Sequence, residues 1–167
     1  MPKALKITSD SVEEIEVSND GAFIQDEEYQ SHKRPWDSHC LSMCERWKHR
    51  QFRLSMVCWD MFHPEEDAEN ILATYVYRRL KHYSGCIPGG GDAGGRPDDL
   101  MYGPVYITNE DTDGIVDITK EDLRYILEQL NEYPISSREL IFHLFLIEVI
   151  EKRFPDLMPS EGEPLLF

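Results

Sequence analysis

The stretch from Pro64 to Tyr83 constrains the fold of this chain more than any other part of the sequence. Pro64 is tolerated in the first turn of a helix, and the acidic residues that follow it suit the positive end of the helix dipole. Apolar residues then recur at helical spacing, and a basic last turn precedes Ser84 and Gly85. The apolar positions are Ala68, Ile71, Leu72, Tyr75, Val76 and Leu80. The pattern predicts an amphipathic helix with one face toward a core.

Three other stretches have the composition of strands. Apolar and acidic residues alternate from Glu14 to Val17, and Ser18–Gly21 has the residue types of a tight turn, so an N-terminal hairpin is expected. Residues 51–59 alternate before an apolar end, and residues 102–108 are typical of a buried strand. Residues 109–114 are predicted to form a polar turn.

Further helices are expected on both sides of these strands. Asp37 or Ser38 is a candidate cap for a helix to about Arg50. Thr119 and Asp122 form a variant capping box ahead of an apolar stripe. Ser136 or Ser137 can open a last helix that runs through Arg153 and is apolar on several sides, so we expect it to be the central core helix.

The order of these elements predicts an α+β fold, because strands and helices do not alternate regularly. A small, mostly antiparallel sheet would be packed by about four helices. The chain has 167 residues, 41% of them apolar, which is enough for one core. We expect a single domain over residues 1–155, with a mobile glycine-rich loop at 86–99 and a short acidic tail at 156–167.

The charge balance excludes several classes of protein. The chain has 17 basic and 32 acidic residues, a net charge of −15, which disfavours nonspecific binding to nucleic acid or to anionic membranes. No apolar run has the length of a bilayer span, and the first residues lack the features of a secretory signal. We therefore expect an intracellular protein, with its four cysteines reduced.

Two groups of residues are candidate metal ligands. Cys40, Cys44, Cys58 and His63 have a spacing close to that of a Cys3His zinc site, although Cys40 and Cys44 also lie on the apolar stripe of the expected helix, where a reduced cysteine packs as a small apolar residue. The second group resembles a calcium loop, with its last position occupied by a lysine. It comprises Asn109, Asp111, Asp113, Gly114, Val116 and Asp117. The interpretation without a metal is favoured for both groups, and no cofactor is expected.

The charges are unevenly distributed along the chain. Residues 31–60 have six basic and three acidic residues, whereas residues 98–167 have five basic and sixteen acidic residues. No catalytic motif is present. The leading hypothesis is therefore a small binding protein, an inhibitor or accessory factor that contacts a protein with a basic surface. The predicted contact residues are the acids Glu128 and Glu132 and the apolar chain end, Leu165, Leu166 and Phe167.

Two other classes stay open. One is an enzyme whose site lies beside the 86–99 loop, because long loops often carry function. The other is a zinc-stabilised nucleic-acid-binding module centred on residues 36–63, where basic and aromatic side chains are interleaved.

Overall fold

A computed structural model describes most of the chain. The described residues are 1–19, 24–27, 39–42, 52–58, 68–83, 100–132, 134–135, 137 and 139–158. Their strands are β1 (Lys3–Ile7), β2 (Val12–Val17), β3 (Ile24–Gln25), β4 (His39–Ser42), β5 (Leu54–Cys58), β6 (Val105–Asp111) and β7 (Gly114–Val116). Their helices are α2 (Ile71–Tyr83), α3 (Lys120–Asn131) and α4 (Leu140–Arg153).

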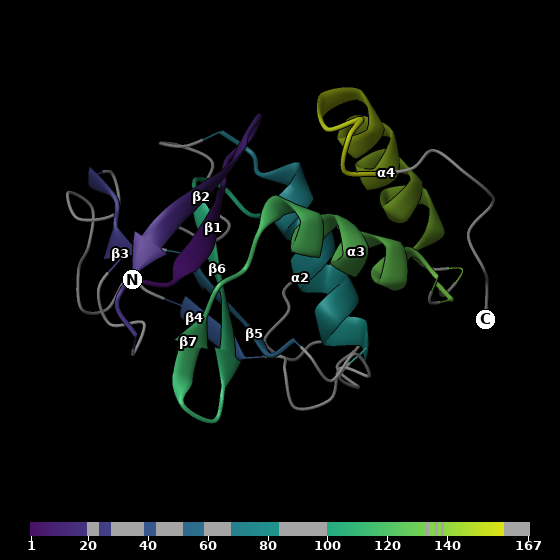
Figure 1. Cartoon of the computed structure of the whole chain (residues 1–167). Helices are drawn as coiled ribbons and strands as arrows, with labels where there is room; N and C mark the ends of the chain where they lie inside the picture. Colours follow the sequence, from purple (N-terminus) through teal and green to yellow (C-terminus); the bar gives the residue numbers. More distant parts are fainter. Residues whose placement is uncertain are drawn as a thin grey trace.

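The strands form one antiparallel sheet in the order β3-β2-β1-β6-β5-β4, with β7 paired to the end of β6. The three helices lie together on one side of the strands (Figure 1). The α+β class and the small antiparallel sheet are thus confirmed, with three helices in the described part of the chain where the sequence predicted about four.

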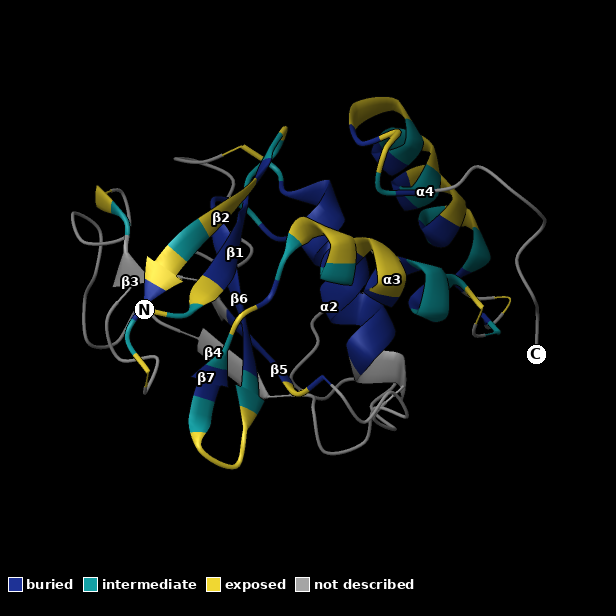
Figure 2. Cartoon of the chain, viewed as in Figure 1, coloured by how far each residue is buried: buried dark blue, intermediate teal, exposed yellow. Residues whose placement is uncertain are grey.

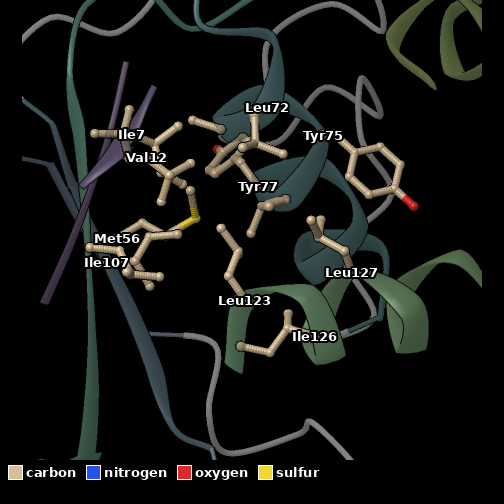
Figure 3. Close-up of a cluster of buried hydrophobic side chains, with 14 of the residues drawn as sticks. Ile7, Val12, Met56, Leu72, Tyr75, Tyr77, Ile107, Leu123, Ile126 and Leu127 are labelled. Carbon is tan, nitrogen blue, oxygen red and sulfur yellow. The ribbon is translucent and has the colours of Figure 1, made fainter. Parts of the chain in front are cut away.

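The main core lies between the sheet and the helices. Alternate residues of β1, Leu5 and Ile7, point into it, as do Met56 of β5 and Ile107 of β6. Figure 3 shows Ile7, Met56 and Ile107 facing side chains of α2 and α3. The helical residues labelled there are Leu72, Tyr75, Tyr77, Leu123, Ile126 and Leu127. Burial of these apolar surfaces, at about 25 cal/mol per Å2, is the main force that holds the layers together.

Helix α2 occupies the centre of this core. Every residue from Ile71 to Leu80 is buried, which Figure 2 shows as an unbroken dark blue helix over that range. The helix begins at Ile71 rather than near Pro64, because the Asn70 side chain accepts a hydrogen bond from the Ala73 backbone N–H at 3.1 Å, in the manner of an N-cap. Residue Glu69 bridges to Tyr102 instead of continuing the helix.

The opposite face of the sheet carries a smaller cluster. Ala4, Val17, Tyr106 and Ile115 are buried there. Near this cluster, Gly114 has a φ of +129°, and the Asn19 carbonyl oxygen lies 2.7 Å from the position that a Cβ would take. The turn into β7 therefore depends on glycine. The sequence predicted a polar turn at 109–114, but β6 extends to Asp111 and pairs with β7 as a hairpin.

Two of the expected helices are corrected by the structure. The segment 37–50 was expected to be helical, but His39–Ser42 form β4, which pairs with β5. Ladder hydrogen bonds to β5 take precedence there over the local helical spacing of apolar residues. The last helix begins at Leu140 with Glu139 as its cap residue, not at Ser136 or Ser137, and it lies at the periphery of the core.

The other predicted boundaries are met to within a few residues. The β2–β3 pairing of Val17 with Ile24 confirms the N-terminal hairpin, and β5 and β6 fall in the predicted strand regions. The core extends along the chain to Met158. The single domain at 1–155 stays a prediction, and the loop at 86–99 and the end of the tail at 159–167 lie outside the described residues.

Candidate functional site

Helix α4 has more large apolar residues than its contacts with the core bury. The residues of α4 that are buried are His143, Leu146 and Ile150, which lie one turn apart on a narrow stripe facing α2. A helix that packs through one stripe against one neighbour leaves its other faces in solvent. Since nearly every position in the first half of α4 is apolar, some large apolar side chains must remain on the surface.

Three such side chains form the outer face of α4. Ile141, Leu144 and Phe145 are 84%, 45% and 46% exposed. Among the described residues, the other exposed large apolar side chains are Met1 and Tyr125. Figure 2 shows exposed and intermediate positions along the outer side of α4. We call Ile141, Leu144 and Phe145 the outer face of α4.

The outer face continues inward through Phe142. The Phe142 ring stacks near the Phe145 ring, with centroids 6.1 Å apart and an interplanar angle of 14°. The Arg78 guanidinium of α2 lies 4.9 Å from the centre of the Phe142 ring. These contacts hold the aromatic side chains at the edge of the α2–α4 junction. Phe142 thus connects the outer face of α4 to the packed junction between α2 and α4.

A small cavity lies in the junction itself. It is lined by side chains of both helices, and its volume open to the centre of a water molecule is about 10 Å3. The lining residues are Tyr75, Arg78, Arg79, Glu139, Phe142, His143 and Leu146. This volume is that of one water molecule, so the cavity does not hold an organic substrate.

Two titratable groups in the junction, His143 and Tyr75, have pKa values shifted from their ordinary values. Burial, and to a smaller extent the nearby Arg79, lower the pKa of His143 to about 4. Burial also raises the pKa of Tyr75 above its ordinary value, against an opposing effect of Arg79. His143 is therefore neutral at pH 7, and the Tyr75 and His143 rings pack with centroids 5.6 Å apart. Arg79 in turn donates from Nε and Nη2 to the Leu130 carbonyl of α3, at 3.3 and 3.1 Å.

A second polar cluster lies on the other face of the sheet. The Asp26 carboxylate lies 3.1 Å from the Lys6 ammonium and accepts a hydrogen bond of 2.6 Å from the Tyr106 hydroxyl. Lys6 and Tyr106 are direct partners in the β1–β6 ladder, which places both on one face. The cluster satisfies a largely buried charge and fixes the segment after β3 against the sheet. A structural role is therefore enough to account for Lys6, Asp26 and Tyr106.

The acids predicted to contact a partner lie at the end of α3. Glu128 is half exposed, and its carboxylate is 4.0 Å from the Arg124 guanidinium one turn earlier. Glu132 is exposed and is the residue at which α3 ends. The apolar end at Leu165, Leu166 and Phe167 lies outside the described residues.

The proposed zinc ligands are described only in part. Cys40 lies in β4 opposite Val57, and Cys58 lies in β5 opposite His39, so the two cysteines occupy successive rungs of one ladder. Cys40 lies in a strand and not on the helix that was expected to hold both Cys40 and Cys44. Cys44 and His63 lie outside the described residues, and the zinc site stays a prediction.

The side chains of the calcium-like segment have other partners. Asn109 accepts a hydrogen bond from the Arg53 backbone, Asp111 from the Asp113 backbone, and Asp117 from the Lys3 backbone. The segment contains the paired end of β6 and β7, so it is a hairpin rather than a loop between two helices. Among the residues that the structure describes, no group of three or more His, Cys, Asp or Glu side chains is placed to hold a metal ion.

Sequence reasoning missed the outer face of α4. It assigned Ile141, Leu144 and Phe145 to the core, because a helix that is apolar on several sides usually lies in a protein interior. One signal was available: α2 had already been identified as an amphipathic helix with a wide apolar face, and a small sheet can cover few such helices. No sequence pattern indicated that His143 and Arg79 would meet.

Comparison with protein-family models, with curated proteins and with solved structures found no match to this chain. None of the helices in the described ranges is both long and apolar enough to cross a membrane.

Proposed function

We propose that this chain is a binding protein that docks the outer face of α4 onto a partner protein. The observation that carries the proposal is the exposure of three large apolar side chains on one well-formed helix. Exposed apolar side chains gathered in one place are typical of interaction surfaces, whereas single ones scattered over a surface are ordinary.

The spacing of the outer face matches a known mode of recognition. Ile141, Leu144 and Phe145 stand at positions i, i+3 and i+4, and helices that bind in a groove present their anchors at this spacing. The helix is already folded and held by α2, so binding would not have to order it. A partner with an elongated apolar groove is the complementary surface.

Charge adds a requirement on the rim of that groove. Glu148 follows the apolar anchors at i+7, paired to Lys152 at 3.2 Å, and Glu151 lies one turn farther along the helix. The whole chain has a net charge of −15. We therefore infer a partner with a basic rim around its groove, and a role for this chain as an intracellular inhibitor or accessory factor that occupies that groove.

The enzyme and the nucleic-acid module have less support. The α2–α4 cavity has the volume of one water molecule, and the 86–99 loop and most of 36–63 lie outside the described residues. Both classes stay predictions.

The test has two stages. The tagged chain is used to capture proteins from its native cells, beside a double variant with Ile141→Ser and Phe145→Ser and a control with Lys152→Ala on the same exposed side. Proteins that the wild type and the control retain, and the double variant loses, are purified and titrated calorimetrically against all three chains.

Loss of two buried anchors commonly costs about 2 kcal/mol each, so we expect the double variant to bind on the order of 1,000-fold more weakly. The Lys152→Ala control should bind within a few-fold of the wild type. Equal affinity of the double variant and the wild type for the purified partner would refute docking through the outer face of α4.

A further inference from the structure

His143 lies on the side of α4 opposite to the outer face, against α2. It is 6% exposed and packs on the Tyr75 ring. The charged groups that line the same junction are Arg78 and Arg79 from α2 and Glu139 from the start of α4, and α3 contributes the Leu130 carbonyl that Arg79 binds. Because His143 is buried and lies near the Arg79 guanidinium, a neutral imidazole fits this place and an imidazolium does not.

We propose that acid releases the first half of α4, Leu140–Ile147, from α2, because protonation of His143 places a positive charge in a buried site beside Arg78 and Arg79. Opening of this segment would expose His143 to water, where the imidazolium is solvated. The junction would thus act as a pH-sensitive latch on the helix.

The direction follows from linkage. Burial and Arg79 lower the pKa of His143 to about 4 from an ordinary value of 6.5. A group whose pKa is lowered in the closed state stabilises that state fully above about pH 6.5, and this contribution is lost as the pH falls toward 4. The equilibrium for opening should therefore rise on the order of tenfold between pH 7 and pH 5.

The two halves of α4 are held differently, which localises the release. In the first half, His143 and Leu146 are buried and Phe142 and Ile147 are partly buried, whereas Ile141, Leu144 and Phe145 are exposed. In the second half, Ile150 is buried, and Phe154 and Met158 directly after the helix also lie in the core. There Arg153 also donates a hydrogen bond to the Ser9 carbonyl and lies 3.6 Å from the Glu69 carboxylate. Segments with few buried contacts open at lower free energy than their surroundings.

The release is a property of the free chain and does not depend on a partner. Its consequence for binding does rest on the proposed function: an opened first half would no longer present Ile141, Leu144 and Phe145 in a fixed arrangement, so binding through the outer face would weaken in acid. The experiment is therefore done without a partner, so that the two proposals can fail separately.

Hydrogen exchange of the full chain is followed by mass spectrometry between pH 7 and pH 4.5, with rates corrected for the intrinsic effect of pH. Wild type is compared with His143→Gln, which cannot be protonated in this range, and with Glu139→Gln, which removes the other titratable group of α4 in the junction. Peptides from 140–147 report the release, and peptides from β1 and β6 report global unfolding.

We expect the corrected exchange of 140–147 to rise on the order of tenfold from pH 7 to pH 5 in the wild type and in Glu139→Gln, and to stay level in His143→Gln. Exchange in β1 and β6 should not change. The proposal is overturned if His143→Gln shows the same rise, if the wild type shows none, or if 140–147 and the sheet lose protection together.

A measurement on the wild type alone guards against a variant that does not fold. The six histidines are titrated by NMR, and His143 should titrate well below the exposed ones, in step with the exchange of 140–147. A His143 resonance that titrates near pH 6.5 while α4 stays protected would equally overturn the latch.

Discussion

Asn70 joins three parts of the molecule through one side chain. Its Oδ1 caps α2 by accepting from the Ala73 N–H, and its Nδ2 donates to the carbonyls of Ile7 and Gly103, at 2.8 and 2.9 Å. The residue has no exposed surface, and its backbone N–H donates to the Met101 carbonyl at 2.8 Å. An amide is required because the position needs both an acceptor and two donors.

Replacement of Asn70 by alanine should lower the free energy of unfolding by about 3 kcal/mol, because the cap is lost and two buried carbonyls lose a donor. Asn70→Asp keeps the cap acceptor and removes both donors, so it should also destabilise the fold. Asn131→Ala, at the last residue of α3, is the control and should stay within about 0.5 kcal/mol of wild type. Urea denaturation measures all three, and a wild-type midpoint for Asn70→Asp would contradict this role for Nδ2.

At the level of elements, the sequence correctly predicted the features that depend on residues close together in the chain. The Thr119 and Asp122 capping box is present in full, with the Asp122 backbone donating to Thr119 and the Asp122 side chain accepting from the Thr119 N–H. The N-terminal hairpin is also where the turn residues indicated. Both depend on groups a few residues apart, which a sequence shows directly.

The elements that the sequence did not predict depend on distant partners. β4 exists because β5 offers backbone groups to pair with, and β7 exists because Gly114 allows the chain to return along β6. The outer face of α4 was missed because the space in the core was already occupied by α2 and α3. Which helix faces are buried depends on how the layers pack together, and the sequence of one helix does not show this.

Leu144 and Leu146 give a matched test of the orientation of α4. They are the same residue on the same helix, 45% and 2% exposed. Leu146→Ala should lower the free energy of unfolding by about 2–4 kcal/mol, because it opens a cavity against α2. Leu144→Ala should stay within about 0.5 kcal/mol of wild type. Thermal and urea denaturation compare the two, and losses of similar size would mean that the outer face is covered.

Charge is the property of the whole molecule that the sequence shows without a structure. Residues 98–167 contain sixteen acidic and only five basic residues. Two of the acids, Glu128 and Glu132, lie one turn apart at the end of α3. Summed over the surface, this charge attracts a basic partner over a distance that salt limits to about 8 Å at 0.15 M. It governs how fast a partner arrives, whereas the apolar face governs how long it stays.

Association with a purified partner should therefore slow as ionic strength rises, and a double variant with Glu128→Lys and Glu132→Lys should lower the association rate constant while stability changes by less than about 1 kcal/mol. Stopped-flow or surface-based kinetics at low and high salt measure this. The same association rate at both salt concentrations, in wild type and variant alike, would show that these acids do not guide the encounter.

Docking through the outer face of α4 requires that this face be accessible in the free protein. Thiol labelling measures it directly: Ile141→Cys is compared with Lys152→Cys as an exposed reference and Leu146→Cys as a buried one, with peptide mapping to separate the new thiol from the four native cysteines. We predict that Ile141→Cys reacts at a rate close to that of Lys152→Cys and far faster than Leu146→Cys. A rate as slow as that of Leu146→Cys would show that another part of the chain covers the outer face, and would contradict its role as a docking surface.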